Sequence, residues 1–190
     1  MTPRILVAGL GNIFLGDDAF GCETVRLLAM QPVPEQVRVI DYGIRGFDLA
    51  LALAEPYEAF ILVDATPRGD APGTLYAMEL DGRTIASARP EDAAVEPHGM
   101  NPMKVLAAAQ AMGARPQQVF VVGCEPSPET FETQERIGLS SPVQAALAEA
   151  MAMIRRLVDR ILRQKGEEYE HFRQSSRDRG GHGGGAYDAA

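Results

Sequence analysis

Acidic residues follow several apolar segments of this 190-residue chain. Asp17 and Asp18 come shortly after the apolar run that ends at Gly9, and Asp41 and Asp64 close two further apolar runs. Like charges gathered without a counter-charge are unfavourable, and a bound cation relieves them. If the fold brings these carboxylates together, we expect the chain to contact a cation at that place.

His98 adds a nitrogen donor to this set. It lies in the loop sequence EPHGMNP, whereas His171 and His182 belong to the polar end of the chain. Two carboxylates and one imidazole suit a borderline divalent metal such as zinc or nickel. A metal held in this way polarises a carbonyl and acidifies a bound water, as the hydrolysis of an amide requires. An ordinary histidine on a surface loop is the alternative interpretation.

The scaffold that could gather these residues is visible in the apolar pattern. Strands alternating with helices indicate an α/β fold of three layers, in which a twisted, mostly parallel sheet of about five strands has helices on both faces. In such folds the ligand site lies beyond the carboxyl ends of the strands. We predict strands over 5–9, 37–41, 59–65 and 118–124, an edge strand within 73–80, and helices over 19–30, 47–54, 101–112 and from 141 onward.

Composition and charge limit the class of protein. A net charge of -8 argues against nucleic-acid binding, which needs clustered cations. No apolar run is long enough to span a bilayer, and the start MTPRILVAGL lacks the features of a signal peptide, so we expect a cytoplasmic protein that does not act at a membrane. One α/β domain is expected over 1–165, followed by a polar, glycine-rich tail over 166–190 that we expect to be disordered.

The stretch GLGNIFLGDDAFGC has the first two glycines of a dinucleotide-binding loop. Phe14 stands where the third glycine would permit close helix packing. Asp17 and Asp18 would repel a pyrophosphate placed at the start of the following helix. The sequence therefore argues against a dinucleotide site.

Taken in order, five motifs make the chain resemble the nickel–iron hydrogenase maturation endopeptidases. They are GLGNIFLGDDAFG, DYGIRG, VDA, PHGMNP and VVGCEP, and the resemblance runs from Ile5 to about the end of the last helix. It implies a compact α/β fold and an aspartyl-type endopeptidase activity. The implied substrate is a nickel-loaded hydrogenase large-subunit precursor, from which the enzyme removes a carboxy-terminal extension once nickel has been inserted.

The same resemblance implies roles for individual residues. Asp18, Asp64 and His98 match the family's metal-binding positions, and the nickel they would contact is carried by the substrate, although other divalent metals could occupy the site. Relatives often have glutamate where this chain has Asp18, and aspartate is shorter, so Asp17 could share its role. Asp41 is a candidate supporting acid or general base.

Asp41 also begins the D-x-G-x-x-G pattern that contains Gly43 and Gly46. These glycines would allow unusual backbone angles in a mobile turn that faces the substrate, and an ordinary strand-to-helix connection is the equally weighted alternative.

Two other functions fit parts of the sequence. Cys124 could act as a nucleophile with His98 as its base, although the adjacent Glu125 would raise the pKa of the thiol. Alternatively, the acids and His98 could serve a nickel-binding maturation chaperone that is not an enzyme. Loss of activity on thiol alkylation would favour the first, and binding of a precursor without shortening it would favour the second.

Overall fold

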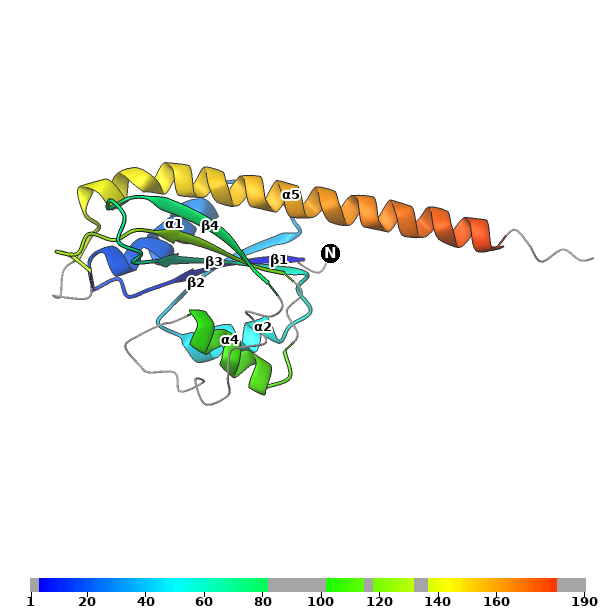
Figure 1. The fold of residues 1–190 in the computed structure, drawn as a ribbon, viewed down its shortest axis with the longest axis horizontal. Coiled ribbons are helices and arrows are strands. Elements are labelled where there is room, and N and C mark those ends of the chain that lie inside the picture. Colours follow the sequence, from blue (N-terminus) through cyan, green and yellow to red (C-terminus); the bar gives the residue numbers. More distant parts are fainter. Residues whose placement is uncertain (1–3, 82–101, 115–117, 132–136, 181–190) are drawn as a thin grey trace, which may run out of the picture. The chain divides into compact units, whose positions relative to one another are not determined.

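A five-stranded sheet forms the centre of the protein, in the strand order β2-β1-β3-β5-β4 (Figure 1). The computed structural model describes residues 4–81, 102–114, 118–131 and 137–180. β2, β1, β3 and β5 run parallel, and β4 lies antiparallel to β5 at one edge. The predicted parallel sheet and antiparallel edge strand are therefore confirmed. The strands are β1 (Ile5–Leu10), β2 (Val37–Gly43), β3 (Ala59–Ala65), β4 (Leu75–Leu80) and β5 (Gln118–Cys124).

Helices cover both faces of this sheet (Figure 1). After the short 3-10 helix η1 (Asp17–Ala19), α1 (Phe20–Ala29) lies on one face, and α2 (Gly46–Leu53) and α4 (Pro102–Ala111) lie together on the other. β1 and β3 are buried along their whole length because both of their faces are covered, which explains their continuous apolar sequences. The expected three-layer α/β architecture is confirmed.

The strand register brings the predicted acids to one edge of the sheet. On β1, Gly9 is paired with Asp41 of β2 on one side and with Val63 of β3 on the other. Asp64 is the next residue of β3 and is paired with Gly123 of β5. Asp41 and Asp64 therefore flank the carboxyl end of the central strand β1.

The last helix is longer than the sequence predicts. α5 (Ser141–Gly180) continues through residues 166–180, where we expected a disordered tail, so that prediction is wrong for this segment. Glu, Gln and Arg are common there and have high helix propensity, so a helix that has already begun can continue through this polar sequence. Residues 181–190, the rest of the predicted tail, lie outside the described residues.

Two compact units divide the chain at a point within α5. The first is Met1–Arg155 and the second is Arg156–Ala190, so the division lies before residue 165, the domain boundary expected from the sequence. The first unit contains the whole sheet and all the candidate site residues.

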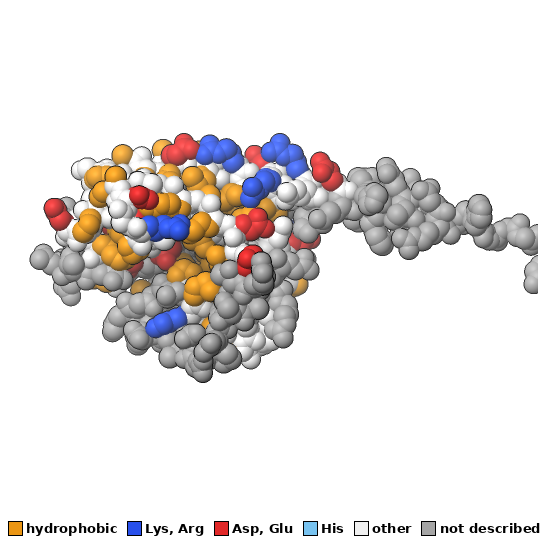
Figure 2. Space-filling model, viewed as in Figure 1, with side chains coloured by type: hydrophobic (Ala, Val, Ile, Leu, Met, Phe, Trp, Pro, Cys, Tyr) orange, Lys and Arg blue, Asp and Glu red, His pale blue; other side chains and the backbone are white. Residues whose placement is uncertain are grey.

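The described surface mixes charged and apolar side chains. Figure 2 shows acidic and basic side chains close together along α5, with hydrophobic side chains exposed on the same face of the molecule. Among the described helices, none combines the length and the apolar character needed to cross a membrane.

Candidate active site at the carboxyl ends of the strands

The loop after β1 carries Asp18, and a hydrogen bond joins its first residues to this acid. The Asn12 N–H donates a hydrogen bond of 2.7 Å to Oδ2 of Asp18. Gly11 has a φ of 120°, and a Cβ at this residue would lie only 1.7 Å from the Asp18 carbonyl oxygen. A side chain at position 11 would thus displace the backbone of Asp18, so this glycine is required for the position of the acid.

Close packing of α1 against the strands explains two further glycines of the first motif. A Cβ on Gly21 would lie 2.1 Å from the Val63 carbonyl oxygen and 2.3 Å from that of Leu10. A Cβ on Gly9 would lie 2.5 Å from the carbonyl oxygen of Gly21. Gly21 is therefore the glycine that allows close packing of the helix on the strands, a role that a dinucleotide-binding loop would give to position 14. It lets the first turn of α1 contact the carboxyl ends of β1 and β3.

Asp41 is exposed and organises the turn after β2. Its Oδ1 accepts a 2.9 Å hydrogen bond from the Gly43 N–H, and Gly43 has a φ of 54°. The Gly43 carbonyl in turn accepts a 3.2 Å hydrogen bond from the Gly11 N–H. The positive φ expected in this motif is therefore confirmed at Gly43. It is not found at Gly46, a buried residue that begins α2.

Cys22 shows that the acids converge. Its thiol is buried and donates a 3.3 Å hydrogen bond to the Gly11 carbonyl. Burial raises the pKa of this thiol well above its ordinary value, and the negative charges of Asp41, Asp18 and Asp64 raise it further. The pKa of this one thiol is therefore sensitive to acids from three separate segments. The strand register places two of them, Asp41 and Asp64, on either side of the carboxyl end of β1.

His98, the predicted nitrogen ligand, lies outside the described residues. Within the ranges that the structure describes, no three His, Cys, Asp or Glu side chains are placed so that they could hold a metal ion by themselves. Asp18 and Asp64 would supply two oxygen ligands, so a third ligand would have to come from elsewhere in the chain or from a substrate.

Asp17 is separated from this group by burial. It has no exposed surface, and its carboxylate accepts hydrogen bonds from the Ser127 N–H at 2.8 Å and the Thr130 hydroxyl at 2.7 Å. The N–H and the hydroxyl of Ser140 donate to it at 2.6 and 2.8 Å. Burial acts to raise its pKa, but these hydrogen bonds outweigh burial and the pKa is lowered. Asp17 is therefore an ionised structural acid that joins η1 to the start of α5.

Glu125 has a comparable structural role after β3. Its carboxylate accepts hydrogen bonds from the N–H groups of Arg68 and Gly69, at 2.8 and 3.0 Å, and from the Tyr76 hydroxyl at 2.6 Å. Burial would raise the pKa of Glu125, but the Tyr76 and backbone hydrogen bonds lower it. This buried acid fixes the loop that follows Asp64, and sequence analysis assigned it no such role.

Cys124 is poorly suited to act as a nucleophile. It has no exposed surface, and burial, together with the charges of Asp17 and Glu125, raises the pKa of its thiol to about 12. Only a thiolate attacks a carbonyl efficiently, and this thiol stays protonated near neutral pH. The geometry of Cys124 therefore argues against the cysteine-peptidase alternative.

Known proteins share both the sequence pattern and the fold. Residues 22–157 match the model of a family described as hydrogenase maturation protease, a range that includes Asp64 and His98 but begins after Asp18. HupD of Rhodobacter capsulatus, described as a hydrogenase expression/formation protein, is 33% identical over 80% of this chain and 71% of its own length. The hydrogenase 2 maturation protease of Escherichia coli K12 is 30% identical over 80% of this chain and 88% of its own length.

Solved structures agree with these sequence matches. The hydrogenase maturating endopeptidase HybD of Escherichia coli has a TM-score of 0.60 and 28% identity, covering 80% of this chain and 89% of its own. A hydrogenase 2 maturation peptidase from Thaumarchaeota archaeon SCGC_AB-539-E09 has a TM-score of 0.63 and 30% identity, covering 82% and 98%. The fold is therefore that of the known maturation peptidases.

Proposed function

Because the chain belongs to the hydrogenase maturation protease family, and is therefore a hydrolase, we propose that it removes the carboxy-terminal extension of a nickel–iron hydrogenase large-subunit precursor after nickel insertion. Membership of a protease family argues against the alternative that the chain is a nickel-binding chaperone without enzymatic activity.

Recognition of the substrate's nickel is the finer part of the proposal. Asp18 and Asp64 would each supply a carboxylate oxygen and His98 an imidazole nitrogen. The observation that supports this assignment is the strand register, which puts Asp41 and Asp64 on either side of the carboxyl end of β1, together with the hydrogen bond that ties Asp18 to Asn12 just after that strand. A divalent cation would offset the repulsion between these acids. Nickel is then a part of the substrate, and other divalent metals could bind in its place.

Hydrolysis would use water as the nucleophile. Both cysteines are buried with raised pKa values, so neither thiol is available as a thiolate near neutral pH. The substrate's nickel would polarise the scissile carbonyl. Asp41 is exposed at the edge of the site and is our candidate for the base that takes the proton from water. Its carboxylate also holds Gly43, so its loss would affect the turn as well as the chemistry.

The proposed partner is the nickel-loaded precursor. The net charge of -8 gives no support to a nucleic-acid partner. The cytoplasmic location expected from the sequence stays a prediction.

The experiment that tests this function compares single substitutions in the full chain. Asp18→Asn, Asp64→Asn and His98→Ala should each reduce the processing of nickel-loaded precursor at least about a hundredfold, because each removes a ligand on which the position of the scissile bond depends. Processing is measured by the mass change of the precursor. Asp159→Asn, which changes an exposed acid of α5, is the matched control and should process at the wild-type rate.

Thermal unfolding checks that each variant folds. Processing at the wild-type rate by a folded Asp64→Asn or His98→Ala variant would remove that residue from the proposed site.

A further inference from the structure

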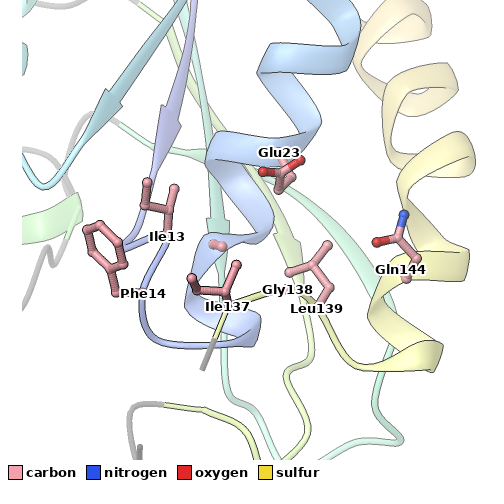
Figure 3. A pocket seen from close by; sticks show the side chains of 8 residues that line it. Ile13, Phe14, Glu23, Ile137, Gly138, Leu139 and Gln144 are labelled. Atoms are coloured by element: carbon pink, nitrogen blue, oxygen red, sulfur yellow. The ribbon is translucent and has the colours of Figure 1, made fainter. Parts of the chain in front are cut away.

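A pocket of about 300 Å³ lies beside the loop that carries Asp18 (Figure 3). Its apolar wall is formed by Ile13 and Phe14 of that loop and by Ile137 and Leu139 before α5. Glu23 of α1 and Gln144 of α5 provide its polar side. All of these residues belong to the first unit of the structure.

The apolar residues of this pocket are unusually exposed. Ile13, Phe14 and Ile137 have 47%, 57% and 85% of their surface in solvent. Single exposed apolar residues are common on proteins, but several gathered around a concave site with a polar rim are typical of a binding site.

Hydrogen bonds hold both walls in place. On one side, the Asn12 side chain accepts a 3.0 Å hydrogen bond from the Phe14 N–H, and the Asn12 carbonyl accepts one from the Leu15 N–H at 3.0 Å. On the other side, the two hydrogen bonds from Ser140 to Asp17 fix the residue that follows Leu139. Phe14 and Leu139 therefore lie beside backbone groups that hydrogen bonds hold in place, which reduces the entropy lost when a ligand binds.

We propose that this pocket receives an apolar side chain of the precursor polypeptide, next to the bond that is cut. Ile13 and Phe14 lie in the loop that the hydrogen bond between Asn12 and Asp18 closes, so the pocket and the acid site share one structural element. In this proposal, a polypeptide bound at Asp18 places one of its side chains in the pocket formed by the same loop. Gln144 offers amide groups to its backbone, and the four apolar residues offer a surface for one large aliphatic side chain.

This inference rests on the proposed function, because it names a feature of the same substrate. The carboxylate of Glu23 is paired with Arg26 at 2.5 Å, so the rim carries a neutralised acid rather than an isolated charge. An apolar side chain therefore fits the pocket better than a basic one.

The test measures steady-state processing of nickel-loaded precursor by Ile13→Ser and Ile137→Ser. Each should raise KM about five- to tenfold and change kcat less than about twofold, because each removes apolar contact area made before the chemical step. Met30→Ser is the matched control, since Met30 is 69% exposed at the opposite end of α1 from the pocket. It should leave both constants unchanged.

Substrate variants identify the occupant. Precursors are made in which each apolar residue within a few positions of the cut bond is replaced in turn by serine. One of these precursors should have a raised KM with the wild-type enzyme. The Ile13→Ser enzyme should then show no further rise in KM for that precursor, as expected for two side chains in contact. Unchanged KM for Ile13→Ser and Ile137→Ser, or fully additive effects for every precursor variant, would overturn the pocket assignment.

Two other outcomes are separated by controls. If Ile13→Ser changes the sedimentation of the enzyme alone, the pocket is an interface between two copies and the proposal is wrong. If the wild-type enzyme does not shorten the precursor, the proposed function itself fails. Wild-type processing with no effect of the pocket variants removes only the pocket assignment.

Discussion

The carboxylate of Asp17 accepts hydrogen bonds from both the N–H and the hydroxyl of Ser140, at 2.6 and 2.8 Å. The two residues lie far apart in the sequence, and their contact joins the loop after β1 to the start of α5. The neighbouring acid, Asp18, is only half-buried and accepts a hydrogen bond from the Asn12 N–H. Two adjacent aspartates of the same motif therefore have different environments, and burial distinguishes them.

Replacing Asp17 should affect stability far more than replacing Asp18. Asp17→Ala leaves the buried Ser140 N–H and the part-buried Ser127 N–H without their acceptor, so we expect the free energy of unfolding to fall by about 3 to 5 kcal/mol. Asp18→Asn should lower it by less than about 1 kcal/mol while greatly reducing processing. Urea unfolding and a processing assay on both variants check this contrast. Equal losses of stability would contradict it.

Acid should weaken the fold partly through Asp17. Hydrogen bonds hold its pKa in the folded protein below the ordinary value of an aspartate, so the unfolded chain takes up the proton first as the pH falls. The stability that this carboxylate provides is complete above the unfolded pKa and is lost as the pH falls through the folded pKa. Unfolding curves between about pH 3 and 7 should thus show a smaller acid-induced loss for Asp17→Asn than for the wild type. Parallel pH dependences would contradict this assignment.

Gly21 should tolerate no side chain. Gly21→Ala would place a Cβ 2.1 Å from the Val63 carbonyl oxygen, so α1 must move away from the sheet and we expect a loss of about 3 kcal/mol. Gly113→Ala is a useful comparison, because a Cβ there meets no atom within 4 Å and only its φ of 90° is unfavourable. That variant should lose about 1 kcal/mol. Similar losses in urea unfolding would mean that close packing is not the reason for Gly21.

Thiol reagents should not inhibit the native enzyme. Cys22 and Cys124 are buried, and burial is the largest cause of their raised pKa values. Iodoacetamide near pH 7.5 should therefore label neither thiol of the folded protein and leave processing unchanged, whereas both should react in urea. Inactivation that accompanies labelling of Cys124 would restore the cysteine-peptidase alternative.

The sequence predicted the fold well because its strands are strongly apolar. Residues 59–65 are buried at every position, and β3 has the bounds that the apolar run indicates. The order of the strands in the sheet could not be read from local patterns, since it depends on contacts between distant segments. The polar segment 166–180 was predicted incorrectly as a tail because low hydrophobicity alone does not prevent the extension of an existing helix.

The candidate site was predicted in part. The acids at the strand ends follow from the general rule for parallel sheets, and the register places Asp41 and Asp64 on either side of the end of β1. The different environments of Asp17 and Asp18 depend on Ser127, Thr130 and Ser140, which the local sequence around the two acids does not identify. The sequence does contain a glycine for close helix packing, at Gly21, but it lies farther from Gly9 and Gly11 than the third glycine of a dinucleotide-binding loop would, so the nucleotide pattern did not identify it.

The most direct test of the central claim is the mass of the large-subunit precursor after incubation with the wild-type enzyme, with and without nickel in the precursor. We predict that the nickel-loaded precursor loses its carboxy-terminal extension and that the nickel-free precursor keeps its full mass. Equal shortening of both forms would contradict recognition of nickel through Asp18, Asp64 and His98. Stable binding of the nickel-loaded form without any change in mass would contradict the peptidase function itself.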